Sequence, residues 1–183
     1  MKNYQQLKLN RQIIEIYTDG SCNTVLGSGA WVAILLVSDE KILLKGEARR
    51  TTNNRMELTA AIKAIEFVNS NYTNALLKIY TDSQYLSHLP KRKEKLKKNL
   101  FRSKKGELLQ NSDLVKTLLV QIENHSIEFI KVKAHQKSMA AHSNTPASFN
   151  REVDKLARKM VRESVKRIGL ADTHGSHTES AEV

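Results

Sequence analysis

Two aspartates in this chain each end a copy of the same four residues, and carboxylates placed in this way could bind a divalent metal ion. Asp19 ends the tetrapeptide Ile-Tyr-Thr-Asp at residues 16–19, and Asp82 ends its second copy at residues 79–82. Each copy closes a β-rich run and is followed by Gly or Ser, so each aspartate falls where a strand is expected to end. Ligands in open α/β sheets collect beyond the carboxyl ends of parallel strands. If the two strands are neighbours, both carboxylates share one rim, where Mg²⁺ or Mn²⁺ would offset their repulsion.

Two further carboxylates stand near the starts of predicted helices and could join this pair. Glu57 lies in TTNNRMEL, where apolar residues begin to recur at helical spacing after Asn53. Asp154 lies in NREVDKLA, near the start of a second periodic helix. Each has a simpler explanation, because Asn54 with Glu57 resembles a capping box and Asn150 could cap the helix that carries Asp154. The residues alone leave both explanations open.

The elements that must position these carboxylates alternate between strand and helix. The predicted strands are residues 12–20, 29–38, 41–50, 75–83 and 126–135. The predicted helices begin at Asn53, at Ser112 as an N-cap, and at Asn150, and the last two cover residues 112–124 and 150–168. Short links between the first strands favour antiparallel hairpins, and the later β–α–β passage favours a parallel pair. The order βββαβαβα therefore predicts an α/β domain with three antiparallel strands and two parallel additions.

Composition limits the classes of protein that the chain can belong to. Its 183 residues suit one domain, and a hydrophobic content of 40% suffices for a core. The formal net charge of +11 favours a polyanionic partner, either nucleic acid or an anionic membrane. No apolar run could span a bilayer, and the N-terminus lacks the apolar region of a secretory signal. With Cys22 as the only cysteine, a disulfide framework and a cysteine zinc cluster are excluded, and a soluble cytoplasmic protein is expected.

Five motifs in the chain resemble those of a known family when they are taken in order. YTDGSC, TTNNRMEL, YTDSQY, VKAH and NREVDKLA are similar to the motifs of type 1 ribonuclease H, the bacterial ribonuclease HI family, over residues 12–166. The resemblance implies a ribonuclease H-like fold, with a five-stranded mixed sheet flanked by helices. It also implies an endonuclease that hydrolyses the RNA strand of RNA–DNA hybrids and leaves 5′-phosphate and 3′-hydroxyl ends.

The resemblance also implies a catalytic site with two divalent metal ions, with Mg²⁺ as the first choice and Mn²⁺ as the alternative. The carboxylates that it assigns to metal binding and catalysis are Asp19, Glu57, Asp82 and Asp154. One ion would activate a water for in-line attack on the phosphodiester, and the other would stabilise the departing oxygen. His135 matches a histidine that assists proton transfer or product release, and His142 in the same loop is a possible substitute.

Polar and basic residues complete the expected contacts with an RNA–DNA hybrid. Thr52 and Asn53 match positions that hold a DNA phosphate, and Asn54 and Gln84 match residues that approach the minor groove. The stretch 88–105 contains nine Lys or Arg residues and matches the family's basic handle, which predicts phosphate binding with a strong salt dependence. The handle residues expected to take part are Lys91, Arg92, Lys93, Lys95, Lys97 and Lys98. A run of like charges can also be only a solvated surface.

Two other hypotheses compete with this interpretation. An integrase, transposase or junction resolvase of the same superfold would act on DNA, but TTNNRMEL and the basic insert after TDSQY argue against it. A catalytically inactive hybrid-binding module is the second, and the complete set of carboxylates with a histidine argues against that. The handle departs from familiar bacterial members because it has no tryptophan, and the loop after Cys22 lacks their Gly- and Pro-rich character.

The predicted organisation is a single catalytic unit with short extensions. Residues 1–11 form an N-terminal extension, and residues 12–168 form the ribonuclease H catalytic domain with the handle at 88–105. Residues 169–183 are small, polar and slightly acidic, and a disordered tail is expected there. A monomer that binds RNA–DNA hybrid and no membrane is the expected state.

Overall fold

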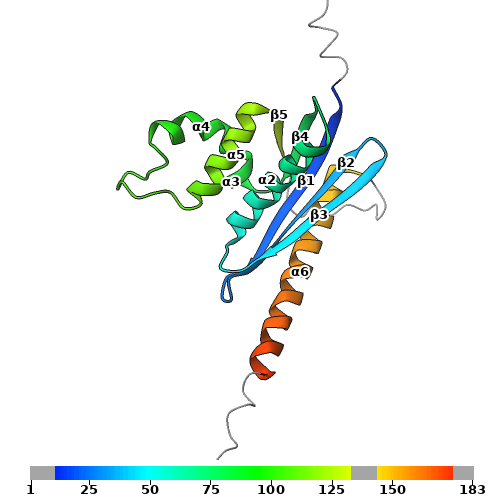
Figure 1. Cartoon of the computed structure of the whole chain (residues 1–183), viewed down its shortest axis with the longest axis vertical. Helices are drawn as coiled ribbons and strands as arrows, with labels where there is room; N and C mark the ends of the chain where they lie inside the picture. Colours follow the sequence, from blue (N-terminus) through cyan, green and yellow to red (C-terminus); the bar gives the residue numbers. More distant parts are fainter. Residues whose placement is uncertain (1–10, 133–143, 175–183) are drawn as a thin grey trace, which may run out of the picture.

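The computed structural model describes residues 11–132 and 144–174, and within these ranges five strands form one sheet. The strands are β1 (Ile13–Asn23), β2 (Ser28–Val37), β3 (Glu40–Ala48), β4 (Leu76–Thr81) and β5 (Ser126–Lys131). The helices are α2 (Asn53–Asn71), α3 (Gln84–Ser87), α4 (Leu89–Lys98), α5 (Ser112–Asn124) and α6 (Pro146–His174). The sheet order is β3-β2-β1-β4-β5, with helices on both of its faces (Figure 1).

The pairing of the strands confirms the predicted mixed sheet. β1 pairs with β2, and β2 with β3, in antiparallel fashion. β1 and β4 are parallel neighbours, as are β4 and β5. The chain crosses from β3 to β4 through α2, which is the kind of connection that two parallel strands require. The two strands that carry the repeated tetrapeptide therefore lie side by side in the centre of the sheet.

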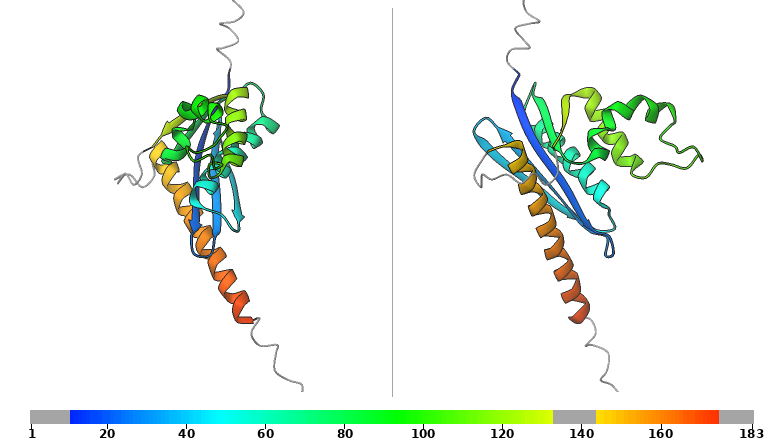
Figure 2. Two further views of the ribbon diagram at one scale, coloured as in Figure 1. Left: turned by 90° about the vertical axis from the view of Figure 1, so that its left-hand side faces the viewer. Right: turned by 180° about the vertical axis from the view of Figure 1, so that it is seen from behind.

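Alternation along β1 separates two apolar layers. Ile14 and Ile16 pack with residues of α2 in the larger cluster, whereas Tyr17 packs with residues of α6 in the smaller one. Figure 2 shows α6 running along one face of the sheet, with α2 and its neighbours on the other. Each Ile or Leu buried in this way contributes about 2 kcal/mol relative to an exposed side chain. The sheet is thus held between two helical layers, and both reach the end where the aspartates lie.

The handle predicted at residues 88–105 is folded and contains helix α4. α4 begins with Pro90 in its first turn and buries Leu89 and Leu96. Leu100 and Phe101 both have positive φ, and this left-handed turn reverses the chain after α4. The handle projects away from the sheet on the α2 side (Figure 1).

Several predicted helix boundaries are wrong. Thr52 is the N-cap of α2, where its side chain accepts a hydrogen bond from the Arg55 N–H at 3.3 Å, so Asn54 does not cap the helix. Asn111 holds the cap position of α5, and Ser112 is the first helical residue. α6 begins at Pro146, which places Asn150 inside the helix.

The C-terminal boundary also differs from the prediction. α6 continues to His174, so the first six residues of the expected disordered tail at 169–183 are helical. The predicted β5 ends at Lys131, and residues 133–135 lie outside the described ranges. No helix in residues 11–132 or 144–174 has the length and apolar character needed to cross a membrane.

Candidate active site

The two copies of Ile-Tyr-Thr-Asp lie next to each other in register. Ile16 pairs with Ile79, and Tyr17 pairs with Tyr80, in the parallel ladder between β1 and β4. The tyrosine rings stack with their centroids 4.7 Å apart. Continuing the same register by two residues brings Asp19 to the level of Asp82, so the repeat delivers one carboxylate from each strand to the same rim.

Asp19 reaches this rim in a different way from the one predicted. β1 does not end there, because its antiparallel pairing with β2 continues to Asn23. β4 ends at Thr81, and Asp82 follows directly. Beyond Thr81, β1 no longer has β4 as its neighbour. The edge of the sheet next to Asp19 is therefore open. The rim is therefore the point where β4 stops while β1 carries on.

Both aspartates belong to the face of the sheet that α6 covers. Asp19 shares its face with Tyr17, because side chains two residues apart in a strand point the same way. Asn150 of α6 donates a hydrogen bond from its side-chain amide to Asp82, at 3.5 Å. The Oδ1 atom of the same Asn150 is buried and has no hydrogen-bond partner among the described residues. Buried polar atoms are normally hydrogen-bonded, so this Asn150 oxygen beside Asp82 is an acceptor at the rim that still needs a hydrogen-bond donor.

Glu57 approaches from the opposite layer, and Gly20 makes that approach possible. A Cβ atom on Gly20 would lie 2.3 Å from the backbone nitrogen of Glu57. Only glycine leaves room there, so α2 packs its first turn directly against β1 beside Asp19. The Glu57 carboxylate accepts a hydrogen bond from the hydroxyl of Ser83. The capping-box interpretation of Glu57 is wrong, because its side chain binds Ser83, which follows Asp82.

Asp154 comes from α6, one helical turn after Asn150. Positions four residues apart share a helix face, which explains why both residues reach the rim. Asp154 is half-buried and forms an ion pair with Arg158, with Nε 2.6 Å from Oδ1. Because Asn150 lies in the interior of α6, Asp154 stands well inside the helix and not in its first turn.

Electrostatic interactions connect the carboxylates. Burial raises the pKa of Asp19 to about 8, and the negative charge of Asp82 is the next largest cause. Asp154 and Glu57 add to this increase in the pKa, while the backbone N–H of Gly20 opposes it. Burial also raises the pKa of Glu57, against the hydrogen bond from Ser83. The rim thus holds more negative charge than its surroundings neutralise.

The chemistry of these donors fits a hard divalent cation, although the side chains do not form a closed shell. Carboxylate oxygens are the ligands that Mg²⁺ and Mn²⁺ prefer. Within the described ranges, no three His, Cys, Asp or Glu side chains lie close enough together to hold a metal ion as they stand. Glu57 is turned toward Ser83, and Asp154 toward Arg158. Both contacts are at side-chain ends, so they involve rotatable groups and not the backbone.

The expected substrate contacts lie on elements beside the rim. Thr52 is half-buried as the cap of α2, whereas Asn53, Asn54 and Gln84 are exposed at the first turns of α2 and α3. His135, and its possible substitute in the same loop, lie outside the described residues. The structure therefore brings the carboxylates and the amides to one region and leaves the histidine unplaced.

The charges of the handle divide into two groups. Lys93 and Lys97 both pair with Glu123 of α5, and the Lys93 Nζ atom lies 3.3 Å from Oε1. Four others are exposed and do not pair with Glu123, namely Lys91, Arg92, Lys95 and Lys98. Two of the six predicted phosphate contacts are thus already engaged within the chain.

Gly20, Ser83, Asn150 and Arg158 take part in the site but were not predicted from the sequence. Asn150 was interpreted as a cap, although its spacing of four residues from Asp154 was a usable signal for a shared helix face. Ser83 had no such signal, because its partner Glu57 is far away in the sequence.

The architecture is that of a known class of nucleases. The crystal structure of LC9-RNase H1, described as a type 1 RNase H with the type 2 active-site motif, has a TM-score of 0.68 with 21% identity, covering 84% of this chain and 74% of that one. The solution structure of the PFV RNase H domain has a TM-score of 0.65 with 19% identity, covering 83% of this chain and 96% of that one. The fold is therefore the ribonuclease H fold.

Sequence comparison narrows this class to a family. Residues 11–162 match the model of the RNase H family. Ribonuclease H of Caldanaerobacter subterraneus subsp. tengcongensis is 34% identical over 162 residues, which cover 87% of this chain and 98% of the relative. Ribonuclease H of Dechloromonas aromatica is 37% identical over 146 residues, which cover 79% and 96% respectively. The chain belongs to the ribonuclease H family and is an endoribonuclease.

Proposed function

We propose that this protein hydrolyses the RNA strand of RNA–DNA hybrids with the help of two divalent metal ions and leaves 5′-phosphate and 3′-hydroxyl ends. The observation that carries the proposal is the in-register placement of Asp19 and Asp82, with Glu57 and Asp154 coupled to them from opposite layers. Relatives that bear the name ribonuclease H support the choice of substrate. Residues 12–168 are proposed as the catalytic unit, with the handle at 88–105.

The metal ions would be held by carboxylates alone. The residues proposed as ligands are Asp19, Glu57, Asp82 and Asp154. When bound, Mg²⁺, or Mn²⁺ as the alternative, supplies a water of lowered pKa and positive charge for the phosphate oxygens. The chain's own task is to place the carboxylates at one rim and to orient them. His135 is proposed to assist proton transfer or product release.

Three side chains orient the carboxylates before substrate arrives. The Ser83 hydroxyl donates a hydrogen bond to Glu57, the Asn150 amide donates one to Asp82, and the Arg158 guanidinium forms an ion pair with Asp154. Each of these contacts favours the ionised carboxylate, because its partner then meets a charged group. Groups that orient a ligand in this way affect metal affinity nearly as strongly as the ligands themselves.

Substrate binding is proposed for the amides and the free cations. The N-terminus of α2 presents backbone N–H groups and partial positive charge beside Thr52 and Asn53, which suits a phosphate. Asn54 and Gln84 can both donate and accept hydrogen bonds, as the minor-groove edges and 2′-hydroxyls of a hybrid require. The exposed cations of the handle would contact phosphates further along the duplex, and their contribution would fall with salt.

A cleavage assay on matched duplexes tests the proposal. An RNA–DNA hybrid labelled on the RNA strand should be cut with Mg²⁺ and left intact with a chelator. The same sequence as DNA duplex should remain whole, and the RNA fragments should be extendable by a polymerase because they end in a 3′-hydroxyl. Cleavage of the DNA duplex alone would instead support a DNA-acting nuclease of the same fold, and binding without cleavage would support an inactive hybrid-binding module.

A further inference from the structure

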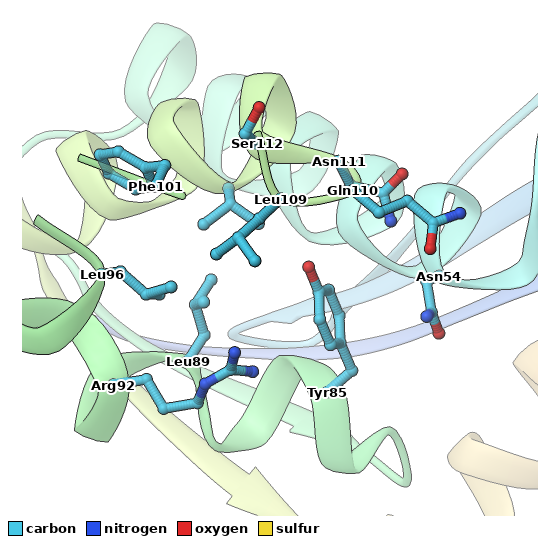
Figure 3. A pocket seen from close by; sticks show the side chains of 11 residues that line it. Asn54, Tyr85, Leu89, Arg92, Leu96, Phe101, Leu109, Gln110, Asn111 and Ser112 are labelled. Atoms are coloured by element: carbon cyan, nitrogen blue, oxygen red, sulfur yellow. The ribbon is translucent and has the colours of Figure 1, made fainter. Parts of the chain in front are cut away.

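A cavity of about 160 Å³ lies between α3–α4 and the start of α5. Its floor is apolar, with Leu89, Leu96 and Val115 each less than a tenth exposed. Phe101 and Leu109 complete the apolar lining (Figure 3). An apolar cavity of about 150 Å³ is large enough to hold a benzene ring. The volume and lining of this cavity therefore suit one planar ring.

The mouth of this cavity is aromatic and polar. Tyr85 stands at one side, and the Arg92 guanidinium lies 6.0 Å from the centroid of its ring. Figure 3 shows Gln110 and Asn111 across from Tyr85, with Asn54 at the end of the mouth. The Oδ1 atom of Asn111 already accepts a hydrogen bond from Arg55. The side-chain amides of Gln110 and Asn54, in contrast, can donate and accept hydrogen bonds and so pair with the polar edge of a heterocycle. A nucleobase combines an apolar ring face with such an edge.

A second cavity, of about 270 Å³, adjoins the first and shares Arg92, Leu96 and Leu109 with it. Its other lining residues include Lys95, Arg102 and Lys104, so cationic side chains dominate. The second cavity is thus a cationic trough beside the apolar first cavity. Together they can hold a base in the first cavity and its neighbouring phosphates along the trough. The charge of the trough selects an anionic chain over an uncharged aromatic ligand.

The first cavity also adjoins the proposed active site. Asn54 precedes Glu57 by three residues on α2, and Tyr85 lies two residues after Ser83, which donates a hydrogen bond to Glu57. A strand that leaves the active site toward the handle would therefore pass the mouth of the cavity. A base inside a duplex must give up its stacking and pairing before it can turn into a pocket. An unpaired base can enter a pocket without that cost.

We propose that this cavity binds one unpaired nucleobase of a single-stranded stretch that adjoins the hybrid, with the phosphates of that stretch along the cationic trough. The inference rests on the proposed function, because it assumes that a hybrid occupies the active site. It names a finer class of substrate, namely hybrids that end in a single-stranded overhang. Such junctions would be bound more tightly than blunt hybrids of the same length.

Binding experiments without cleavage test the pocket directly. Fluorescence anisotropy with a chelator would compare a blunt hybrid with four hybrids that carry a three-nucleotide overhang, one at each end of each strand. At least one overhang should tighten binding about tenfold, which is the size expected for stacking one base. The same overhang with abasic residues should lose that gain. Equal affinity for all five duplexes, or an undiminished gain with the abasic overhang, would overturn the proposal.

A matched pair of variants separates the cavity from the surface of α5. Val115→Phe fills the cavity, whereas Val120→Phe adds the same side chain at a position that is 54% exposed. Val115→Phe should abolish the overhang gain and leave cleavage of the blunt hybrid intact, and Val120→Phe should change neither. If Val115→Phe lowers the thermal stability, Val115→Met serves in its place. An overhang gain that persists in a folded cavity-filling variant would rule the pocket out.

The two proposals fail in different ways. If the wild-type protein does not cut the blunt hybrid with Mg²⁺, the proposed function fails. If it cuts the blunt hybrid but binds overhangs no better, only the pocket proposal fails.

Discussion

Asp19 and Asp82 stand at the same level of two neighbouring parallel strands, two residues beyond the last paired position at Tyr17 and Tyr80. Burial raises the pKa of Asp19, and the negative charge of Asp82 beside it is the next largest cause. Such a pair costs stability unless a cation or a proton compensates it. The relationship makes the two aspartates interdependent, which leads to the first two predictions.

Replacing either aspartate by asparagine should abolish metal-dependent cleavage. Asp19→Asn and Asp82→Asn keep the shape of the side chain and remove one negative oxygen donor. We expect each to lower kcat by more than about 100-fold, since even residues that only orient a ligand cost 10- to 100-fold. The measurement is steady-state cleavage of a labelled hybrid across a Mg²⁺ titration. If either variant keeps near wild-type kcat, its aspartate is not a ligand.

The pH dependence of stability should reveal the raised pKa of Asp19. In the unfolded chain its carboxyl loses a proton near pH 4, whereas in the folded protein the pKa is about 8. Between these values the folded state holds a proton that the unfolded state has lost, so the free energy of unfolding decreases as pH rises. The loss begins near the unfolded pKa and is complete above the folded one.

The comparison with Asp19→Asn isolates this contribution from other titrating groups. In a chelator, we expect the variant to gain stability relative to wild type between about pH 4 and about pH 9, by roughly 1–3 kcal/mol. Urea unfolding at several pH values measures the difference. Added Mg²⁺ should stabilise the wild type more than the variant at neutral pH. A difference that stays constant with pH would contradict the raised pKa.

Gly20→Ala should destabilise the protein and displace Glu57. The added Cβ atom would lie 2.3 Å from the Glu57 nitrogen, which forces α2 away from β1. Overpacking of this kind costs about 1–3 kcal/mol. Thermal unfolding and cleavage assays should both show the loss. Gly169→Ala is the matched control, because no other segment within the described part of the chain lies within 4 Å of its new Cβ, and alanine favours the helix. A harmless Gly20→Ala would mean that the contact is not tight.

Glu123→Gln should strengthen substrate binding by releasing two lysines. Glu123 pairs with Lys93 and Lys97, and the hydrogen bonds from Lys97 and then Lys93 hold its pKa below the usual range. Without the carboxylate both cations become available to phosphate, so KM should fall about two- to fivefold at low salt and return to the wild-type value at high salt. Cleavage kinetics at two salt concentrations provide the measurement.

Two further variants complete that experiment. Glu107→Gln removes the same charge from the handle region, and within the described residues Glu107 forms no ion pair, so KM should change less. Lys98→Ala removes an exposed cation and should raise KM, mainly at low salt. If Glu123→Gln and Glu107→Gln lower KM by the same factor, and Lys98→Ala raises it by a similar one, only total charge matters, and the ion pairs of Glu123 have no special effect.

Sequence patterns predicted the sheet because its signals are local. Apolar runs marked all five strands, and short links indicated the hairpins. The end of β1 was misplaced because Gly20 is a strand-ending residue by type. Its actual role depends on α2, which packs against it from another part of the chain. A local pattern cannot show that a glycine is needed for contact and not for a turn.

The supporting contacts of the site were beyond the same patterns. Asn54 and Thr52 are both good caps, and the packing of α2 against β1 decides which of them begins the helix. The contacts from Ser83 to Glu57 and from Asn150 to Asp82 join elements that are distant in sequence. Such pairs have no periodicity to reveal them. The catalytic roles of the carboxylates stay a prediction, although the fold and family that implied them are confirmed.

The carboxylates come from two helical layers, and this determines when the proposed site can form during folding. Glu57 arrives with α2 on one side of the sheet, and Asp154 arrives with α6 on the other. With Asp154 as a proposed ligand, the proposed site is complete only after residue 154 has emerged during synthesis and α6 has docked. Under that proposal, detachment of α6 alone would abolish cleavage while the sheet and α2 still give their spectroscopic signals. Cleavage activity is then a stricter measure of the native state than helix content. Only the completely folded chain would cleave RNA.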